Sequence, residues 1–410
     1  MMKNNNNVPI NHTLIGYEIE KSIKSYKWKY ILSDLPLNSF LVGGYIRDLI
    51  IRQNKKICST DIDIIVPKDA CIVGNYIAKK YKGKFLLLDQ EREIVRIIFD
   101  EFTIDMAPQI SESLFEDLSS RDFTINSISF ALDSNLIFDP LNGIEDIYKK
   151  SLKTYQPKNM VDDPLRILRC FRFVSELNFK IDKNLLNIIK TYKNNLASVS
   201  VERIQYELKK IIRGENAFKA ILLIKQTQIF QWIQTSESHF DFVNYHLNLN
   251  DFNKDEIINF LPIFYLIETL NDSSIKKLKF SKSEAFEASS LRKWRDKIIQ
   301  KPINALNEVE RFLLHKELEN ILPAFILYLP EKDQLDWLTR WRDKEDKLFH
   351  PAHLLDGKAL KKHIKIQDGP LLGEMLNFLS KELAFKRIKN SDDAIYKAKQ
   401  WFQQNAPKYD

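Results

Sequence analysis

The chain has 410 residues, of which 44% are hydrophobic and 29% are charged, and its formal net charge is +7. This length suffices for two or three domains, and this composition excludes a wholly disordered chain. The N-terminus has no apolar run and no stretch reaches the roughly 18 apolar residues of a membrane span, so we expect neither a secretory signal nor a membrane partner. Three scattered cysteines exclude a disulfide framework or a cysteine zinc site and favour the reducing cytoplasm.

The positive charge is concentrated in one segment. Residues 151–220 hold 14 Lys and Arg against 7 Asp and Glu, whereas the net charge is −2 over residues 1–150 and +2 over residues 221–410. A local basic excess is typical of a surface that binds nucleic acid or nucleotide phosphate, although a solvated lysine-rich surface gives the same count. Charge alone leaves both interpretations open.

In chain order, the sequence predicts a helix over 17–31 and then a region of short strands and helices. The predicted strands are 40–42, 61–66, 85–88, 94–99, 102–106 and 136–138, and the predicted helices are 45–52, 69–81 and 122–131. After residue 150, apolar residues recur at spacings of three and four, which predicts helices to the end of the chain. The pattern therefore predicts a small α/β domain followed by a helical remainder.

Two features of the head suggest phosphate and metal chemistry. Gly43 and Gly44 lie between a predicted strand and a helix, where backbone N–H groups can approach a phosphate, and Arg47 follows on the first turn. Asp61 and Asp63 alternate on a strand, so their carboxylates share one face and suit Mg²⁺. Asp105 on a later strand is a candidate third carboxylate.

Two further segments carry candidate residues. Arg121 and Asp122 stand in the stretch Arg-Asp-Phe-Thr-Ile-Asn, where Asp122 could also cap the helix predicted there. Asp163 precedes Pro164 and suits a helix N-cap. Arginines then recur every third residue along that helix and could bind phosphates or base edges, or form a solvated basic face. These are Arg166, Arg169 and Arg172.

Six short segments, in this order along the chain, resemble the class II tRNA nucleotidyltransferase and bacterial poly(A) polymerase family. They are Gly43–Asp48, Asp61–Asp63, Arg121–Asn126, Asp139–Ile147, Asp162–Phe173 and Val201–Ile211. The resemblance implies an α+β fold: a small N-terminal head with a mixed or antiparallel sheet, followed by an all-helical neck, body and tail. The catalytic head would span 31–150, after an N-terminal extension over 1–30. The resemblance also implies a nucleotide- and RNA-binding neck over 151–220 and a tRNA-binding body and tail over 221–410.

The resemblance also implies roles for the residues. Asp61 and Asp63 match the family's metal ligands, and Asp105 stands where a third catalytic carboxylate would lie. The nucleotide-binding set is Gly43, Gly44, Arg47, Arg121, Asp122, Asp163, Arg166, Arg169 and Arg172. Within it, Asp163 and Arg166 match the pair that reads the edge of the incoming base.

The expected reaction is transfer of CMP, AMP or both from CTP and ATP to the 3′ end of tRNA, with two Mg²⁺ ions. Alternatives are a CC-adding enzyme, an A-adding enzyme, a poly(A) polymerase, or a catalytically silent RNA-binding protein. The chain has no histidine between His12 and His239, so it lacks the Arg-Arg-Phe-x-Leu-x-His stretch expected of a poly(A) polymerase. The oligomeric state and the tRNA contacts of the tail stay open.

Overall fold

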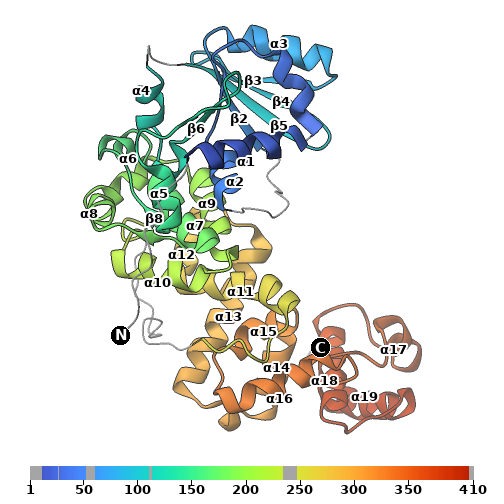
Figure 1. The fold of residues 1–410 in the computed structure, drawn as a ribbon. Helices are drawn as coiled ribbons and strands as arrows, with labels where there is room; N and C mark the ends of the chain where they lie inside the picture. Colours follow the sequence, from blue (N-terminus) through green and yellow to red (C-terminus); the bar gives the residue numbers. More distant parts are fainter. Residues whose placement is uncertain (1–11, 26, 52–60, 110–112, 234–246, 406–410) are drawn as a thin grey trace. The chain divides into compact units, whose positions relative to one another are not determined.

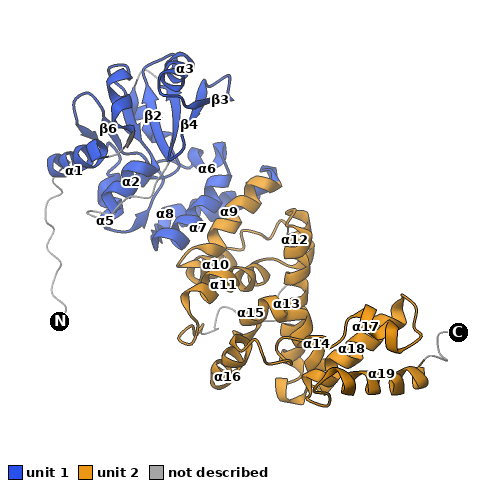
Figure 2. Cartoon of the chain, turned by 90° about the vertical axis from the view of Figure 1, so that its right-hand side faces the viewer, with its two compact units in different colours: residues 1–200 blue, residues 201–410 orange. Residues whose placement is uncertain are grey.

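The computed structural model describes residues 12–25, 27–51, 61–109, 113–233 and 247–405. The chain divides into two compact units, residues 1–200 and 201–410 (Figure 2). The four-part division expected from the sequence therefore stays a prediction about function, and each unit is described by itself.

The centre of unit 1 is a mixed sheet with the strand order β3-β4-β5-β2-β1-β6-β7 (Figure 1). Its strands are β1 (Phe40–Val42), β2 (Asp61–Val66), β3 (Lys84–Asp89), β4 (Ile94–Ile98), β5 (Thr103–Pro108), β6 (Ser129–Ala131) and β7 (Ile137–Phe138). Among the described residues of this seven-stranded sheet, only β2 and β5 pair in parallel, and the other neighbouring strands are antiparallel. The mixed sheet and every strand predicted in the head are thus confirmed, with ends shifted by one or two residues.

Helices cover this sheet and continue beyond it. They are α1 (His12–Ser25), η1 (Lys27–Asp34), α2 (Gly44–Ile51), α3 (Ala70–Lys80), α4 (Leu114–Ser119), η2 (Thr124–Asn126), α5 (Gly143–Tyr148), α6 (Lys158–Asp162), α7 (Leu165–Leu177), α8 (Lys183–Tyr192) and η3 (Lys193–Ser198). The packing of α3 on β4 is close, because a Cβ on Gly74 would lie 2.8 Å from Val95 Cγ2. Strands β4 and β5 bury alternate residues, as expected when one sheet face is covered.

Two predictions about unit 1 were wrong. Residues 122–131 form the 3₁₀ turn η2 and the strand β6 in place of one helix. Residues 122–130 are all buried, so no exposed face marks a helical or strand period. The neck is not wholly helical either, because β8 (Ser151–Leu152) pairs in parallel with β9 (Lys180–Ile181). Strands of two residues are too short to show an alternating pattern.

Unit 2 is helical throughout its described residues. Its elements are α9 (Val201–Arg213), α10 (Ala217–Thr227), α11 (Lys254–Thr269), α12 (Asp272–Lys277), α13 (Lys282–Gln300), η4 (Ile303–Ala305), α14 (Glu308–Leu318), η5 (Glu319–Ile321), α15 (Leu322–Ile326), α16 (Glu331–Arg342), α17 (Gly357–His363), α18 (Pro370–Ala384) and α19 (Ser391–Asn405). The last three helices share a separate apolar cluster that includes Leu360, Met375 and Ala398. No helix of the described residues is long and apolar enough to cross a bilayer.

Candidate nucleotide and metal site

The turn from β1 to α2 requires glycine at position 43. Gly43 has φ +77°, and a Cβ there would lie 2.6 Å from Asp63 Oδ2 and 3.2 Å from Arg121 Nη1. Gly44 begins α2, and a Cβ on it would lie 3.3 Å from Arg47 Nη2. The glycine pair therefore lets the backbone approach both the carboxylate on β2 and two arginines.

The strand register brings three charged side chains of the sheet next to one another. Residue 63 on β2 pairs with residue 42 on β1 and with residue 105 on β5, and residue 105 pairs with residue 96 on β4. Paired residues on neighbouring strands point to the same face of a sheet. Asp63 and Asp105 therefore lie side by side, and Arg96 lies on the far side of Asp105.

Arg96 binds both oxygens of Asp105, through Nε–Oδ1 and Nη2–Oδ2 hydrogen bonds of 2.7 Å each. Such a two-point pair is among the stronger ion-pair geometries, and it raises the pKa of Arg96 further above its usual range. Within the described residues, no three His, Cys, Asp or Glu side chains converge as a metal site. The role of Asp105 as a third catalytic carboxylate stays a prediction.

Asp61 and Asp63 differ in their surroundings. Asp61 is exposed and accepts a 2.7 Å hydrogen bond from Thr103 Oγ1. Burial raises the pKa of Asp63 above its ordinary value; Arg121 opposes the shift, while Asp105 and Asp61 add to it. Crowded carboxylates of this kind are stabilised in their charged form by a cation. Asp61 and Asp63 thus lie on one strand face, beside a turn that has no room for a Cβ. This arrangement fits a divalent metal whose other ligands come from substrate and water.

Asp122 is the centre of a hydrogen-bonded cluster. Its carboxylate is buried and accepts hydrogen bonds of 2.8 Å from the Phe123 N–H, Asn126 Nδ2 and Arg169 Nε. Burial raises the pKa of Asp122, but Arg169 and Asn126 outweigh it and hold the pKa below the ordinary value. The helix cap considered for Asp122 is replaced by this cluster.

Arg47 joins the glycine turn to the same cluster. Its Nη1 donates to Asn126 Oδ1 at 2.8 Å, and its Nε and Nη2 donate to Asp48 Oδ1. Its guanidinium also lies over the Phe173 ring at 4.9 Å. Arg47, Asn126, Asp122 and Arg169 thus form one chain of contacts across α2, η2 and α7, which fixes each side chain before any ligand binds.

At the start of α7, side chains form hydrogen bonds with backbone groups. The helix begins at Leu165 with Pro164 as its N-cap, so the prediction of Asp163 as the N-cap is wrong by one residue. Asp163 Oδ1 still accepts a 3.2 Å hydrogen bond from the Leu165 N–H. Arg166 Nη1 donates to the Ser120 and Asn159 carbonyls at 2.8 and 3.0 Å. These contacts hold Arg166 next to the segment that carries Arg121.

The three arginines of α7 do not form one solvated stripe. Arg169 binds Asp122, and Arg172 is buried, with its Nε 3.5 Å from Glu176 Oε2 and its guanidinium 4.9 Å from the Phe173 ring centre. Only Arg166 and Arg169 are half-exposed. The alternative of a solvated basic face is therefore wrong for Arg172.

Sequence reasoning missed several residues that hold this site. Asn159 is buried and donates to the Ser119 and Arg121 carbonyls at 2.8 and 2.7 Å, which fixes the backbone at Arg121. A Cβ on Gly143 would overlap the Thr124 carbonyl oxygen, so α5 packs directly against η2. Gly143 lies in the segment Asp139–Ile147 that the sequence analysis singled out, but the sequence did not predict which residue it contacts.

Comparisons with known proteins give matches over most of the chain. Residues 39–153 match the family described as the Poly A polymerase head domain, and residues 178–236 match the probable RNA and SrmB-binding site of polymerase A. The chain is 26% identical over 404 residues to a CC-adding tRNA nucleotidyltransferase of Synechocystis sp., covering 89% of this chain and 94% of the relative. It is 24% identical to a CCA-adding enzyme of Staphylococcus aureus, with the same two coverages.

Solved structures show the same fold. The CCA-adding enzyme of Thermotoga maritima, in complex with tRNA, aligns with a TM-score of 0.72 at 19% identity. The alignment covers 94% of this chain and 98% of that chain, so the likeness spans the sheet of unit 1 and the helices of unit 2.

Proposed function

We propose that the chain is a member of the family of tRNA nucleotidyltransferases and bacterial poly(A) polymerases, and that it adds CMP, AMP or both to the 3′ end of tRNA from CTP and ATP. The observation that carries the proposal is the convergence at Gly43. There the glycine turn, the Asp63 carboxylate and the Arg121 guanidinium are close enough that a Cβ would contact both side chains. A cytoplasmic location is part of the proposal, since its substrates are tRNA and nucleoside triphosphates.

The chain's own residues would bind and orient the substrates. The N–H groups at the start of α2, together with Arg47 and Arg121, would bind the triphosphate, and the close approach of these arginines to the glycine turn supports this role. Asp61 and Asp63 would hold Mg²⁺, which when bound lowers the pKa of the attacking 3′-hydroxyl and stabilises the leaving pyrophosphate. Such transfer depends mainly on positioning and charge stabilisation, so no protein general base is required.

Asp163 and Arg166 are the proposed base-reading pair. A carboxylate accepts from the exocyclic amino group of cytosine or adenine, and a guanidinium donates to the ring nitrogen beside it. Because Arg166 is held by the Ser120 and Asn159 carbonyls, its donors are pre-oriented by the backbone. The relatives named above include both CC-adding and CCA-adding enzymes, so which nucleotides are added needs a direct assay.

A label-transfer assay tests this function. Purified protein and Mg²⁺ are given CTP alone or ATP alone, with three tRNAs that end before the first C, after C and after CC. A CCA-adding enzyme labels the first two with CTP and the third with ATP. CTP labelling alone identifies a CC-adding enzyme, ATP labelling of the third tRNA alone an A-adding enzyme, and repeated ATP addition to every RNA a poly(A) polymerase. If no tRNA is labelled, the alternative of a catalytically silent RNA-binding protein is supported.

A further inference from the structure

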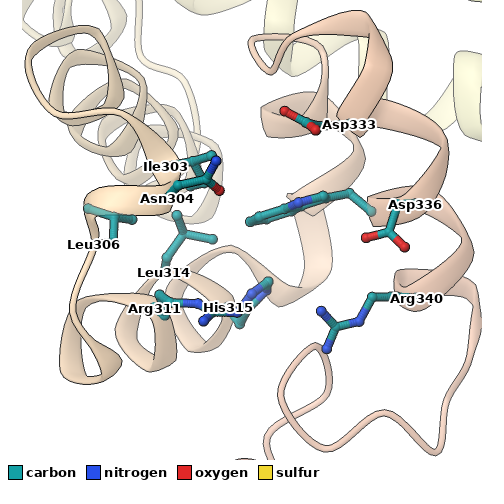
Figure 3. A pocket seen from close by; sticks show the side chains of 10 residues that line it. Ile303, Asn304, Leu306, Arg311, Leu314, His315, Asp333, Asp336 and Arg340 are labelled. Carbon is teal, nitrogen blue, oxygen red and sulfur yellow. The ribbon is translucent and has the colours of Figure 1, made fainter.

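A pocket of about 290 Å³ lies in unit 2, between η4, α14 and α16 (Figure 3). One wall carries Ile303, Leu306 and Leu314, and the indole of Trp337 also lines the pocket. This volume is near the lower end for small-ligand sites, about 300 Å³ and above. An aromatic ring with aliphatic neighbours suits a small planar group.

The polar lining has both signs of charge. Arg311 comes from α14, whereas Asp333, Asp336 and Arg340 come from α16 on the opposite wall (Figure 3). Arg340 pairs with Asp346 through a 2.9 Å hydrogen bond. No described residue forms an ion pair or a side-chain hydrogen bond with Arg311, Asp333 or Asp336. The pocket thus offers donors and acceptors to a ligand that carries both.

His315 also lines the pocket, and its side chain has a buried polar atom. Its side chain is 1% exposed, and its Nδ1 has no hydrogen-bond partner among the described residues. The ring stacks on Trp337 at 5.1 Å and contacts Phe349 at 4.1 Å. Burial, together with Arg340 and Arg311, lowers the pKa of His315 to about 3, so the imidazole is neutral and can either accept or donate. A buried nitrogen without a partner is costly unless a ligand or water meets it.

We propose that this pocket binds one nucleotide whose base carries an exocyclic amino group. The base would lie against Trp337 and the aliphatic wall, its amino group would donate to Asp333 or Asp336, and its phosphate would meet Arg311 and Arg340. Adenine, cytosine and guanine meet this requirement, and uracil does not. The site goes beyond the transfer reaction and shares no residue with the site in unit 1. The nucleotide comes either from solution or from an unstacked position of tRNA.

Calorimetric titration of the full-length protein with AMP, CMP, GMP and UMP tests the free-nucleotide source. The test variant combines Arg311→Gln with Asp336→Asn; both side chains are exposed, so the core is untouched. The matched control is Lys332→Gln, an exposed residue of α16 outside the pocket lining. We expect two AMP sites in the wild type and the control, at least tenfold weaker second-site binding in the double variant, and weaker binding of UMP than of AMP.

Binding of a tRNA that lacks its terminal CCA tests the other source. If the nucleotide belongs to tRNA, the double variant binds that tRNA about tenfold more weakly and excess AMP competes with it in the wild type. An unchanged tRNA affinity with loss of the second AMP site assigns the pocket to free nucleotide. The inference is overturned if the double variant changes neither tRNA affinity nor AMP stoichiometry, or if UMP binds the second site as well as AMP. Active label transfer by that variant would leave the proposed function standing.

Discussion

The two sides of the candidate site in unit 1 differ in how their charges are compensated. On the arginine side, Asp122 receives three hydrogen bonds, and Arg47 and Asn126 extend the same cluster. On the acidic side, Asp63 is buried beside Asp61 and Asp105, and Arg96 already binds both oxygens of Asp105. The arginine side is complete as folded, whereas on the acidic side Arg121 and Arg169 do not offset the burial of Asp63 and the charges of Asp61 and Asp105, so the pKa of Asp63 stays raised. This difference explains why we assign nucleotide binding to one side and a cation to the other.

Removing the acidic pair should have the largest effect. The double variant Asp61→Ala, Asp63→Ala should abolish CMP and AMP incorporation, because nothing else on the strand can replace two carboxylates. Circular dichroism should show a folded protein, since Asp61 is exposed and loss of Asp63 relieves crowding. Label transfer measures the loss. A variant that still extends a tRNA ending at its discriminator base would show that the metal assignment is wrong.

The glycine turn joins the two sides, and blocking it should have the next largest effect. Gly43→Ala adds a Cβ at φ +77° and at 2.6 Å from Asp63 Oδ2, so the carboxylate must move. Displacement of a catalytic group by about 1 Å costs on the order of a hundredfold in kcat. Steady-state kinetics measure the change. Gly373→Ala is the matched control, because nothing lies within 4 Å of its Cβ position, and its kinetics should equal those of the wild type.

The arginine side should matter most for stability. Asp122→Asn removes the charge that compensates Arg169 and should lower the free energy of unfolding by about 2 to 3 kcal/mol. Because folding lowers the pKa of Asp122, its contribution is complete above about pH 4, the unfolded value, and is lost as pH falls through the lower folded pKa.

Urea unfolding between pH 3 and pH 7 measures this contribution. The stability difference between wild type and Asp122→Asn should shrink at the acid end of that range. Asp100→Asn, at an exposed turn between β4 and β5, is the control and should change stability little at any pH. A pH-independent difference for Asp122→Asn would mean that the charge of Asp122 does not matter.

Loss of the proposed base-reading arginine should have the smallest effect of these substitutions. Arg166→Ala should reduce CTP-over-UTP discrimination about tenfold while triphosphate binding changes less, because the proposed contact of Arg166 is to the base and not to the phosphates. Competition kinetics with both nucleotides measure it. Arg92→Ala, in the exposed turn before β4, is the control. Discrimination that stays at the wild-type level would remove Arg166 from the base-reading pair.

Local patterns predicted the parts of the site that depend on local geometry. Asp61 and Asp63 share a face because a strand alternates, and Gly43 marks a turn because only glycine adopts its conformation without strain. The residues that complete the site depend on pairings far apart in the sequence. Arg96 contacts Asp105 only because of the register of β4 on β5. Asn159 of α6 donates to the carbonyl of Arg121, a residue far from it in the sequence.

The same reasoning applies to the fold. Strand β6 was predicted as helix because Ser129–Ala131 are all buried and show no period. The pocket of unit 2 has no sequence signal, because helix packing alone brings Asn304, His315 and Asp336 together. From one sequence, the strand and turn of the candidate site can therefore be predicted, whereas contacts that only the tertiary structure creates cannot.

The most direct test of the central claim is the effect of Mg²⁺ on thermal unfolding at neutral pH. If the acidic side needs a cation, Mg²⁺ raises the Tm of the wild type by binding the folded state. The double variant Asp61→Ala, Asp63→Ala should then show no Mg²⁺-dependent shift. Equal Mg²⁺-dependent shifts in both proteins would contradict the assignment of a cation to Asp61 and Asp63.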